Sequence, residues 1–331
     1  MKKIFTLPFD ENPESCCYPY ICFPHAIICA QTSTDEYNKW LCGKYINCYY
    51  KDKSNGHKFI ISVYDNWSGG KKIMIYQCIN FSKEIMKKMK VNIPLTIKKL
   101  LLNGTYPYGK CRESYIVRSD PSDTGLTDYI ITGYNDIKKV FIIRLFDKNK
   151  ELIKREVYYE EYVSALYDNA NRNIQIHAWK YNDRAEYSLN FSEIINDLED
   201  YIHSRNSKPQ YPDNRTFGLQ AIEDLKNYFL LQSETGANID ERYLRGYYEH
   251  KYFMEQRIKY LCSLNILPSE LLECAENVSL MAQQVMNEGK NYNVSQDGAA
   301  AKELLRLTAE SIETERNYLP EVSASLQWQV K

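Results

Sequence analysis

Cysteines gather near the start of the chain and surround a single histidine. Cys16, Cys17, Cys22 and Cys29 lie close together, with His25 among them. A thiolate can attack a carbonyl carbon, and an imidazole three residues further along a helix shares its face. Cys22 and His25 are therefore candidates for nucleophilic chemistry. The alternative is a set of buried structural cysteines, because cysteine is among the most commonly buried residue types.

A helix is predicted to begin beside Cys22. Pro24 fits the first turn of a helix, because its missing N–H has no partner there in any case. The apolar run Ala26–Ile28 indicates that this helix is buried. Backbone N–H groups at a helix N-terminus lower the pKa of a thiol and can stabilise an oxyanion. Cys22, just ahead of Pro24, is the candidate nucleophile.

Metal and cofactor sites are not expected. The cysteines form no CxxC pair, and a zinc site needs converging thiolate and imidazole ligands at tight spacing. The chain also lacks the full GxxxxGK[ST] pattern and the GxGxxG pattern that cradle phosphates.

The first half of the chain is rich in predicted strands. β-Branched and aromatic residues predict strands at 58–65, 71–79, 113–118, 128–134, 140–146 and 151–157. Ser68–Gly70 marks a turn between the first two, and Asp147–Lys150 closes a hairpin between the last two. Asp128 opens one strand, where a carboxylate can act as a base and can equally cap a turn. We include it among the candidate catalytic residues.

In the second half of the chain, apolar residues have the periodicity of long helices. Apolar residues recur at helical spacing from residue 217 onward, with Pro268 ending the second helix and Pro320 the fourth. Long helices with short connections indicate a bundle. Residues 204–216 are polar and contain two prolines, so they are predicted to be a linker. The expected organisation is an α+β domain over 1–203 and an all-α domain over 217–331.

Several segments resemble the butirosin-biosynthesis acyltransferase family, whose members are relatives of bacteriocin-processing cysteine peptidases. CFPHAI at 22–27 resembles the nucleophile helix of that family, and DYIITGYND at 128–136 with VFII at 140–143 resembles its central strands. FGLQAI at 217–222 and ESIETERNYL at 310–319 are similar to its helical C-terminal domain. Amide-forming enzymes of closthioamide biosynthesis are similar as well.

The resemblance implies a papain-like fold with an antiparallel sheet. It also implies acyl transfer from a carrier-protein thioester to an amine through a Cys-His-Asp triad. The implied setting is natural-product biosynthesis of the peptide or aminoglycoside type. An acyl carrier or a peptide substrate is the implied partner.

Two positions of the implied triad hold other residues. The catalytic His of the family falls on Thr127, six residues ahead of Gly133, and the orienting Asp falls on Ile143 or Arg144. Threonine cannot act as a general base near neutral pH. One hypothesis is therefore a thiol-dependent acyltransferase or amide-forming enzyme that uses Cys22, His25 and Asp128. The other is a catalytically inactive binding or scaffold protein for a peptide, a carrier protein or a partner enzyme.

Charge and hydropathy exclude some partners. The net charge of −1 gives no basic excess for nucleic acid, and the 29 tyrosines are spread along the chain rather than gathered into a stacking platform. The chain shows no apolar run long enough to span a membrane. Asp10 and Glu11 end the apolar start too early for a signal peptide, so a cytoplasmic location is expected. Homodimer formation stays open.

Overall fold

The computed structural model describes residues 2–51, 58–61, 74–81, 83–116, 125–147, 150–168, 174–207 and 215–330. It is an α+β structure with antiparallel sheets and a helical C-terminal region. The chain forms two compact units, one of Met1–Ser33 and Asn66–Glu186, the other of Thr34–Asp65 and Tyr187–Lys331. The predicted turn at Ser68–Gly70 and most of the predicted linker lie outside the described residues.

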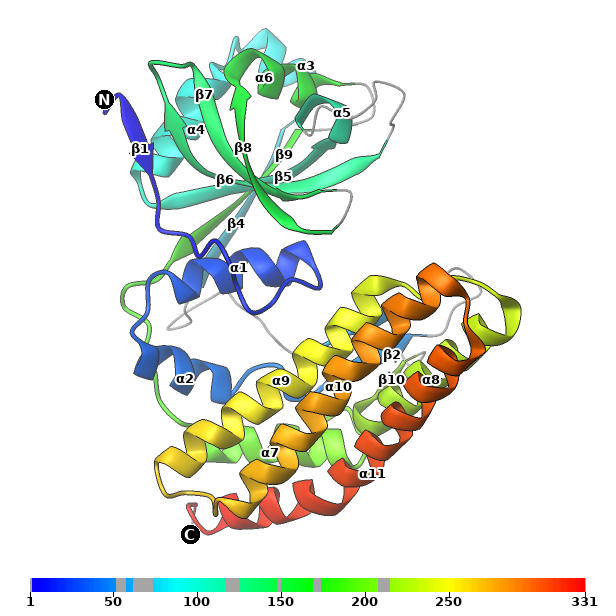
Figure 1. Ribbon diagram of the computed structural model, residues 1–331. Coiled ribbons are helices and arrows are strands. Elements are labelled where there is room, and N and C mark those ends of the chain that lie inside the picture. Colours follow the sequence, from blue (N-terminus) through cyan, green and yellow to red (C-terminus); the bar gives the residue numbers. More distant parts are fainter. Residues whose placement is uncertain are drawn as a thin grey trace. The chain divides into compact units, whose positions relative to one another are not determined.

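The first unit is organised around a seven-stranded antiparallel sheet (Figure 1). Its strands are β1 (Ile4–Thr6), β4 (Met74–Phe81), β5 (Thr105–Arg112), β6 (Leu126–Asn135), β7 (Val140–Phe146), β8 (Leu152–Tyr158) and β9 (Ile174–Tyr181). The order is β4-β9-β5-β6-β7-β8, with β1 paired beside β6. The predicted hairpin is confirmed, since β7 and β8 pair from Val140↔Tyr158 to Phe146↔Leu152.

Gly133 allows β1 to approach β6. Thr6 lies opposite Gly133, and a Cβ at this position would stand 2.5 Å from the carbonyl oxygen of Phe5. The register between β6 and β7 also shifts between Ile131 and Gly133, which bends the strand. The glycine in the DYIITGYND motif is thus explained by strand packing.

One side of the sheet carries the hydrophobic core of the first unit. The helices of this part are α3 (Lys83–Lys88), α4 (Ile93–Leu102), α5 (Glu113–Ile116) and α6 (Tyr159–Tyr167). Tyr129 and Ile143 of the sheet pack in one cluster with Ile97 of α4 and Tyr162 of α6. Burial of this apolar surface is the main force that holds helices and sheet together.

The second unit is mostly helical. Its helices are α2 (Thr34–Cys42), α7 (Phe191–Ile202), α8 (Gly218–Thr235), α9 (Glu241–Ser263), α10 (Glu270–Ser295) and α11 (Gly298–Gln327). The long helix α10 packs against both α9 and α11 (Figure 1). A small sheet joins β2 (Tyr49–Lys51), β3 (Lys58–Ile60) and β10 (Thr216–Phe217).

Some predicted elements differ from the structure. The strands predicted around the turn at 68–70 belong to different sheets, because β3 pairs with β2 whereas β4 pairs with β9. Residues 113–116 form helix α5 instead of a strand, and Ile116 of this helix packs into the core of the first unit. Pro320 lies inside α11, which continues to Gln327.

The two units also divide the chain differently from the predicted domains 1–203 and 217–331. Residues 34–65 belong to the helical unit, because β2 pairs with β10 and α2 packs against α9. Helix α7 belongs there too, since it packs against α8 and α11.

Candidate functional site

One side of the large sheet carries a row of side chains from four adjacent strands. His177 on β9 lies opposite Tyr108 on β5, which in turn lies opposite Ile130 on β6. Ile130 lies opposite Arg144 on β7. Directly opposed residues share a face of an antiparallel sheet. The ring of Phe23, on helix α1 (Pro19–Cys29), packs 5.8 Å from that of Tyr108 between centroids, so we call this side the α1 face.

Tyr108 connects the ionisable groups at one end of the α1 face. Its hydroxyl donates a 2.6 Å hydrogen bond to Oδ1 of Asp128, and its ring centroid lies 5.5 Å from that of His177. The ammonium of Lys110 lies 3.7 Å from Oδ2 of Asp128. A carboxylate, a phenol, an imidazole and an ammonium thus meet on the sheet.

The imidazole of His177 is neutral at pH 7. Partial burial lowers its pKa, the charge of Asp128 opposes that shift, and the charge of Lys110 adds to it. A neutral imidazole can accept a proton from a nucleophile or from an amine. The sequence did not indicate His177, because its place beside Tyr108 depends on the pairing of β9 with β5, which local patterns do not reveal.

Helix α1 begins at Pro19, which corrects the predicted start at Pro24. Pro24 lies inside the helix, and Cys22 lies one turn after its first residue. The Cys22 N–H donates to the carbonyl of Tyr18 at 2.8 Å, so this amide is used within the helix. The stabilisation of a thiolate by helix N–H groups falls off within the first turn. The geometry that was predicted to make Cys22 acidic is therefore absent.

Both candidate catalytic residues of α1 are buried. Cys22 and His25 are each 0% exposed, and the Sγ of Cys22 lies 3.8 Å from the Sγ of Cys16. The Cys16 thiol donates to the Pro13 carbonyl at 3.3 Å. Burial lowers the pKa of His25 to about 3, so this side chain does not become an imidazolium near neutral pH.

Thr127, which the resemblance assigns to the triad His, and Ile143, one of the two positions that it assigns to the triad Asp, face the opposite side of the sheet. Ile143 belongs to the hydrophobic core, and Thr127 shares the face of Tyr129, which is also a core residue. Asp128, the chain neighbour of Thr127, faces α1 instead, and so does Arg144, the other position assigned to the triad Asp. Of the three candidate residues, Asp128 therefore lies with the His177 cluster, whereas Cys22 and His25 lie within α1.

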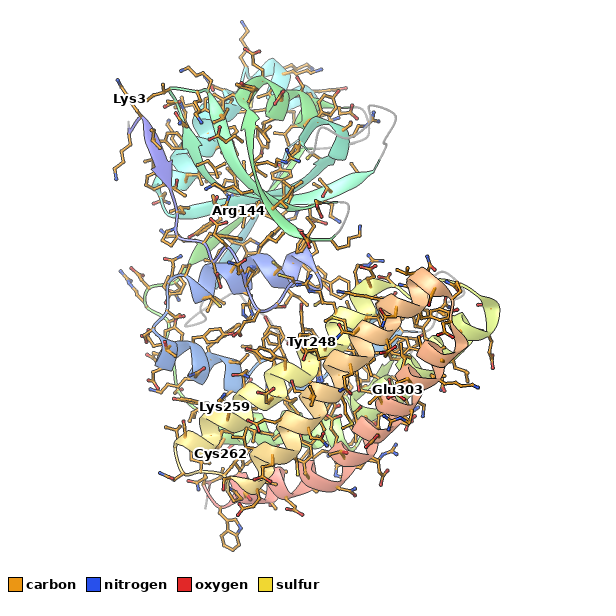
Figure 2. All side chains as sticks on the ribbon, in the orientation of Figure 1. Lys3, Arg144, Tyr248, Lys259, Cys262 and Glu303 are labelled. Atoms are coloured by element: carbon orange, nitrogen blue, oxygen red, sulfur yellow. The ribbon has the colours of Figure 1, made fainter. Side chains whose placement is uncertain are left out.

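Arg144 brings a buried charge to the same α1 face (Figure 2). Its guanidinium forms an ion pair with the carboxylate of Glu11. Burial lowers the pKa of Arg144, and the charge of Glu11 opposes that shift. Arginine stays charged in proteins, so the α1 face carries a cation at one end and the Tyr108–Asp128 pair at the other.

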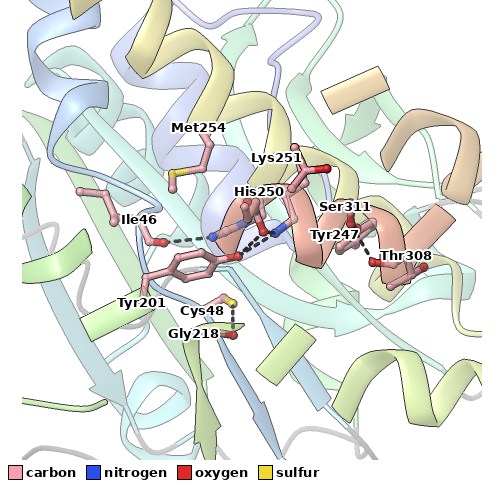
Figure 3. Close-up of polar contacts among 12 residues, drawn as sticks. Ile46, Cys48, Tyr201, Gly218, Tyr247, His250, Lys251, Met254, Thr308 and Ser311 are labelled. Atoms are coloured by element: carbon pink, nitrogen blue, oxygen red, sulfur yellow. Dashed lines mark hydrogen bonds and ion pairs between the residues drawn. The ribbon is translucent and has the colours of Figure 1, made fainter. Parts of the chain in front are cut away.

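The second unit contains a fully buried ion pair that the sequence analysis did not single out. Lys251 of α9 and Glu315 of α11 are each 0% exposed, with 2.5 Å between Nζ and Oε2. The Tyr201 hydroxyl accepts from Lys251 at 2.7 Å (Figure 3). The same hydroxyl donates to Glu315 at 2.8 Å. The Lys251 Nζ also lies 5.3 Å from the ring centroids of Tyr201 and Tyr247. The sequence does contain a sign of this ion pair, because α9 and α11 each carry a charged residue within their stripe of apolar side chains.

His250 adjoins this ion pair and is neutral. Its Nε2 lies 3.0 Å from the Ile46 carbonyl oxygen, and its ring centroid lies 5.1 Å from that of Tyr201 (Figure 3). Burial holds the pKa of His250 well below its usual value, and Lys251 adds to the shift. The network joins α7, α9 and α11 to residue 46, which is a structural role.

Comparison with protein-family models gave no match, and comparison with curated proteins gave none either. Among the described residues, no three His, Cys, Asp or Glu side chains form a group able to hold a metal ion. Within the same ranges, no helix has the length and apolar character needed to cross a membrane.

Proposed function

We propose that this protein is a binding or scaffold protein on a papain-like domain, which holds a peptide or a carrier-bound group without forming a covalent bond to it. The observation that carries the proposal is the burial of Cys22, whose sulfur lies 3.8 Å from that of Cys16. A nucleophile must come within van der Waals reach of a substrate carbonyl, and a fully buried thiol does not.

The charges on the α1 face support noncovalent recognition. Asp128 and Arg144 lie on neighbouring strands with opposite charge. Asp128 follows the position at which the resemblance expects the His, and Arg144 is one of the two positions at which it expects the Asp. Charge-assisted hydrogen bonds to such groups orient a ligand strongly without any reaction. Thr127 cannot replace the missing base.

The second candidate is a thiol-dependent acyltransferase or amide-forming enzyme of natural-product biosynthesis, and His177 favours it. A neutral imidazole lies on the α1 face beside the Tyr108–Asp128 pair. In such a reaction His177 takes the Cys22 proton, the thiolate attacks a thioester carbonyl, and the carrier thiol leaves with that proton. An amine then displaces the Cys22 thiol to form the amide.

Incubation of the full chain with an acyl-pantetheine thioester separates the two functions. We expect no acyl adduct in the intact mass, and we expect Cys22→Ala to leave thioester consumption unchanged. Cys29→Ala, at the last residue of α1, is the matched control. An adduct mapped to Cys22, together with at least a hundredfold loss of its formation in His177→Gln, would contradict the proposal and support the acyltransferase.

A further inference from the structure

Arg144 uses few of its hydrogen-bond donors. The side chain is 2% exposed, and its Nη2 donates to the carboxylate of Glu11. Its Nε and Nη1 are buried and have no hydrogen-bond partner among the described residues. A guanidinium has five N–H donors in a planar fork that matches a carboxylate held by two parallel hydrogen bonds. Only some of the N–H donors of the Arg144 guanidinium therefore have an acceptor.

The side chain of Glu11 can leave Arg144 while the neighbouring backbone stays in place. Its side chain is 53% exposed, in contrast to the guanidinium that it contacts. The backbone beside it is anchored, because the Asp10 N–H donates to the Ala26 carbonyl of α1 at 3.0 Å. Rotation of the Glu11 side chain into solvent would release the guanidinium without moving this backbone contact.

The surroundings of Arg144 suit an organic acid. The guanidinium carbon lies 5.7 Å from the centre of the Phe9 ring, which provides an aromatic wall. Lys154 lies opposite Arg144 on β8 and is exposed, so a second cation shares this end of the sheet. Apolar Ile130 lies opposite Arg144 on its other side.

We propose that Arg144 binds the carboxylate of a ligand, and that Glu11 occupies this site in the free protein as an internal competitor. The inference rests on the proposed binding function and names the chemistry of its ligand. A ligand carboxylate takes the Nη2 donor that Glu11 holds in the free protein together with the unpartnered Nε, and Glu11 moves into water. The carboxylate comes either from a peptide C-terminus or from a free organic acid.

Calorimetric titration of the full chain with N-acetylphenylalanine tests this site, because the probe carries a carboxylate beside an aromatic ring. Its amide, N-acetylphenylalanine amide, is the matched neutral ligand. We expect the acid to bind and the amide not to bind. A short peptide with a free C-terminus, compared with its amidated form and with phenylpropanoate, distinguishes the two sources of the carboxylate.

Two substitutions should shift the affinity of the protein for N-acetylphenylalanine in opposite directions. Glu11→Gln removes the competing charge and should tighten binding of the acid about tenfold, as expected if Glu11 occupies the site about nine-tenths of the time. Arg144→Lys keeps the charge but loses the fork, and should weaken binding. Thermal unfolding of each variant shows whether it is folded, and Glu11→Gln changes only a half-exposed side chain.

The inference is overturned if Glu11→Gln binds the acid no more tightly than the unchanged protein, if acid and amide bind equally, or if neither protein binds the acid. These outcomes are separate from the failure of the proposed function. An acyl adduct on Cys22 together with tighter binding by Glu11→Gln would make Arg144 the substrate-carboxylate residue of an enzyme.

Discussion

His25 and His177 are both neutral at pH 7, but their surroundings give them different roles. His25 is fully buried within α1, where burial lowers its pKa to about 3. His177 is half-buried and faces a carboxylate, so it stays able to exchange a proton with a ligand. His25, which was predicted to act with Cys22, is thus a buried histidine. The imidazole that can exchange a proton with a ligand is that of His177, on a strand distant in sequence.

Acid should destabilise the protein partly through His25. Between pH 6.5 and about 3 the unfolded chain binds this proton and the folded chain does not. The stability that neutral His25 contributes is complete above pH 6.5 and is lost as the pH falls towards 3. His25→Gln should therefore reduce the dependence of the unfolding free energy on pH by up to about 1.4 kcal/mol per pH unit.

Urea unfolding at several pH values between pH 6.5 and about 3 measures this slope. His203→Gln, which removes an exposed histidine, is the matched control. Equal slopes for His25→Gln and the unchanged protein would show that burial of His25 is not coupled to acid unfolding.

At the scale of elements, local patterns indicated many of the strands and helices, although not α5, and they did not indicate which elements pack together. The hairpin at Asp147–Lys150 follows from turn chemistry between adjacent strands. The contact between Tyr108 and His177 needs the pairing of two strands that are far apart in sequence. A shift of one residue exchanges the faces of a strand, so Thr127, which the resemblance matches to the triad His, and its neighbour Asp128 lie on opposite sides of the sheet.

Gly218 begins α8 in a conformation that few other residues adopt. Its φ is +56°, and a Cβ there would collide with the backbone carbonyl of Tyr201. Gly218→Ala should therefore cost at least about 2 kcal/mol of unfolding free energy, from left-handed backbone strain and overlap. Gly236, at the other end of α8, has φ +67° but nothing within 4 Å of its Cβ position.

Gly236→Ala is thus the control for backbone strain alone, with an expected cost of about 1 kcal/mol. Urea unfolding of both variants gives the comparison. Equal costs would mean that the approach of Gly218 to Tyr201 does not constrain the start of α8.

The buried pair of Lys251 and Glu315 should behave differently when one or both charges are removed. Glu315→Gln leaves an uncompensated ammonium in the core and should cost about 3–5 kcal/mol. Replacing Lys251 and Glu315 with Met, and Tyr201 with Phe, removes all three interacting polar groups together. This triple variant should recover most of the loss, because a hydrophobic core can replace a buried ion pair.

Chemical denaturation of the single and triple variants tests the pair. A triple variant that is less stable than Glu315→Gln would show that the network stabilises the bundle beyond balancing its own buried charge.

At the scale of the whole molecule, the chain passes between its units three times. The helical unit needs residues 34–65, because the Tyr45 ring stacks on Phe253 at 4.7 Å and the Arg257 guanidinium donates to the Cys42 carbonyl at 2.9 Å. From composition alone, these residues were predicted to belong to the same domain as the strands that follow them in the chain. Charge, hydropathy and helical period describe only residues that are close in sequence. They therefore cannot show that residues 34–65 belong to the helical unit although residues of the other unit flank them on both sides.

A fragment of residues 217–331, the predicted helical domain, should consequently fail to fold. It lacks α7, β2 and the segment that packs against α9, so apolar surface on three helices stays exposed. Circular dichroism during a urea titration is expected to show a broad, non-cooperative transition. A sharp transition like that of the full chain would mean that residues 217–331 form a domain of their own.

Residue-resolved alkylation of the native protein tests most directly whether Cys22 is structural. Iodoacetamide labelling followed by peptide mass spectrometry compares Cys22 with Cys29, which lies on the same helix and is half-buried. We expect Cys29 to react first and Cys22 to stay unlabelled until urea unfolds the chain. Labelling of Cys22 ahead of Cys29 in the folded protein would contradict this expectation.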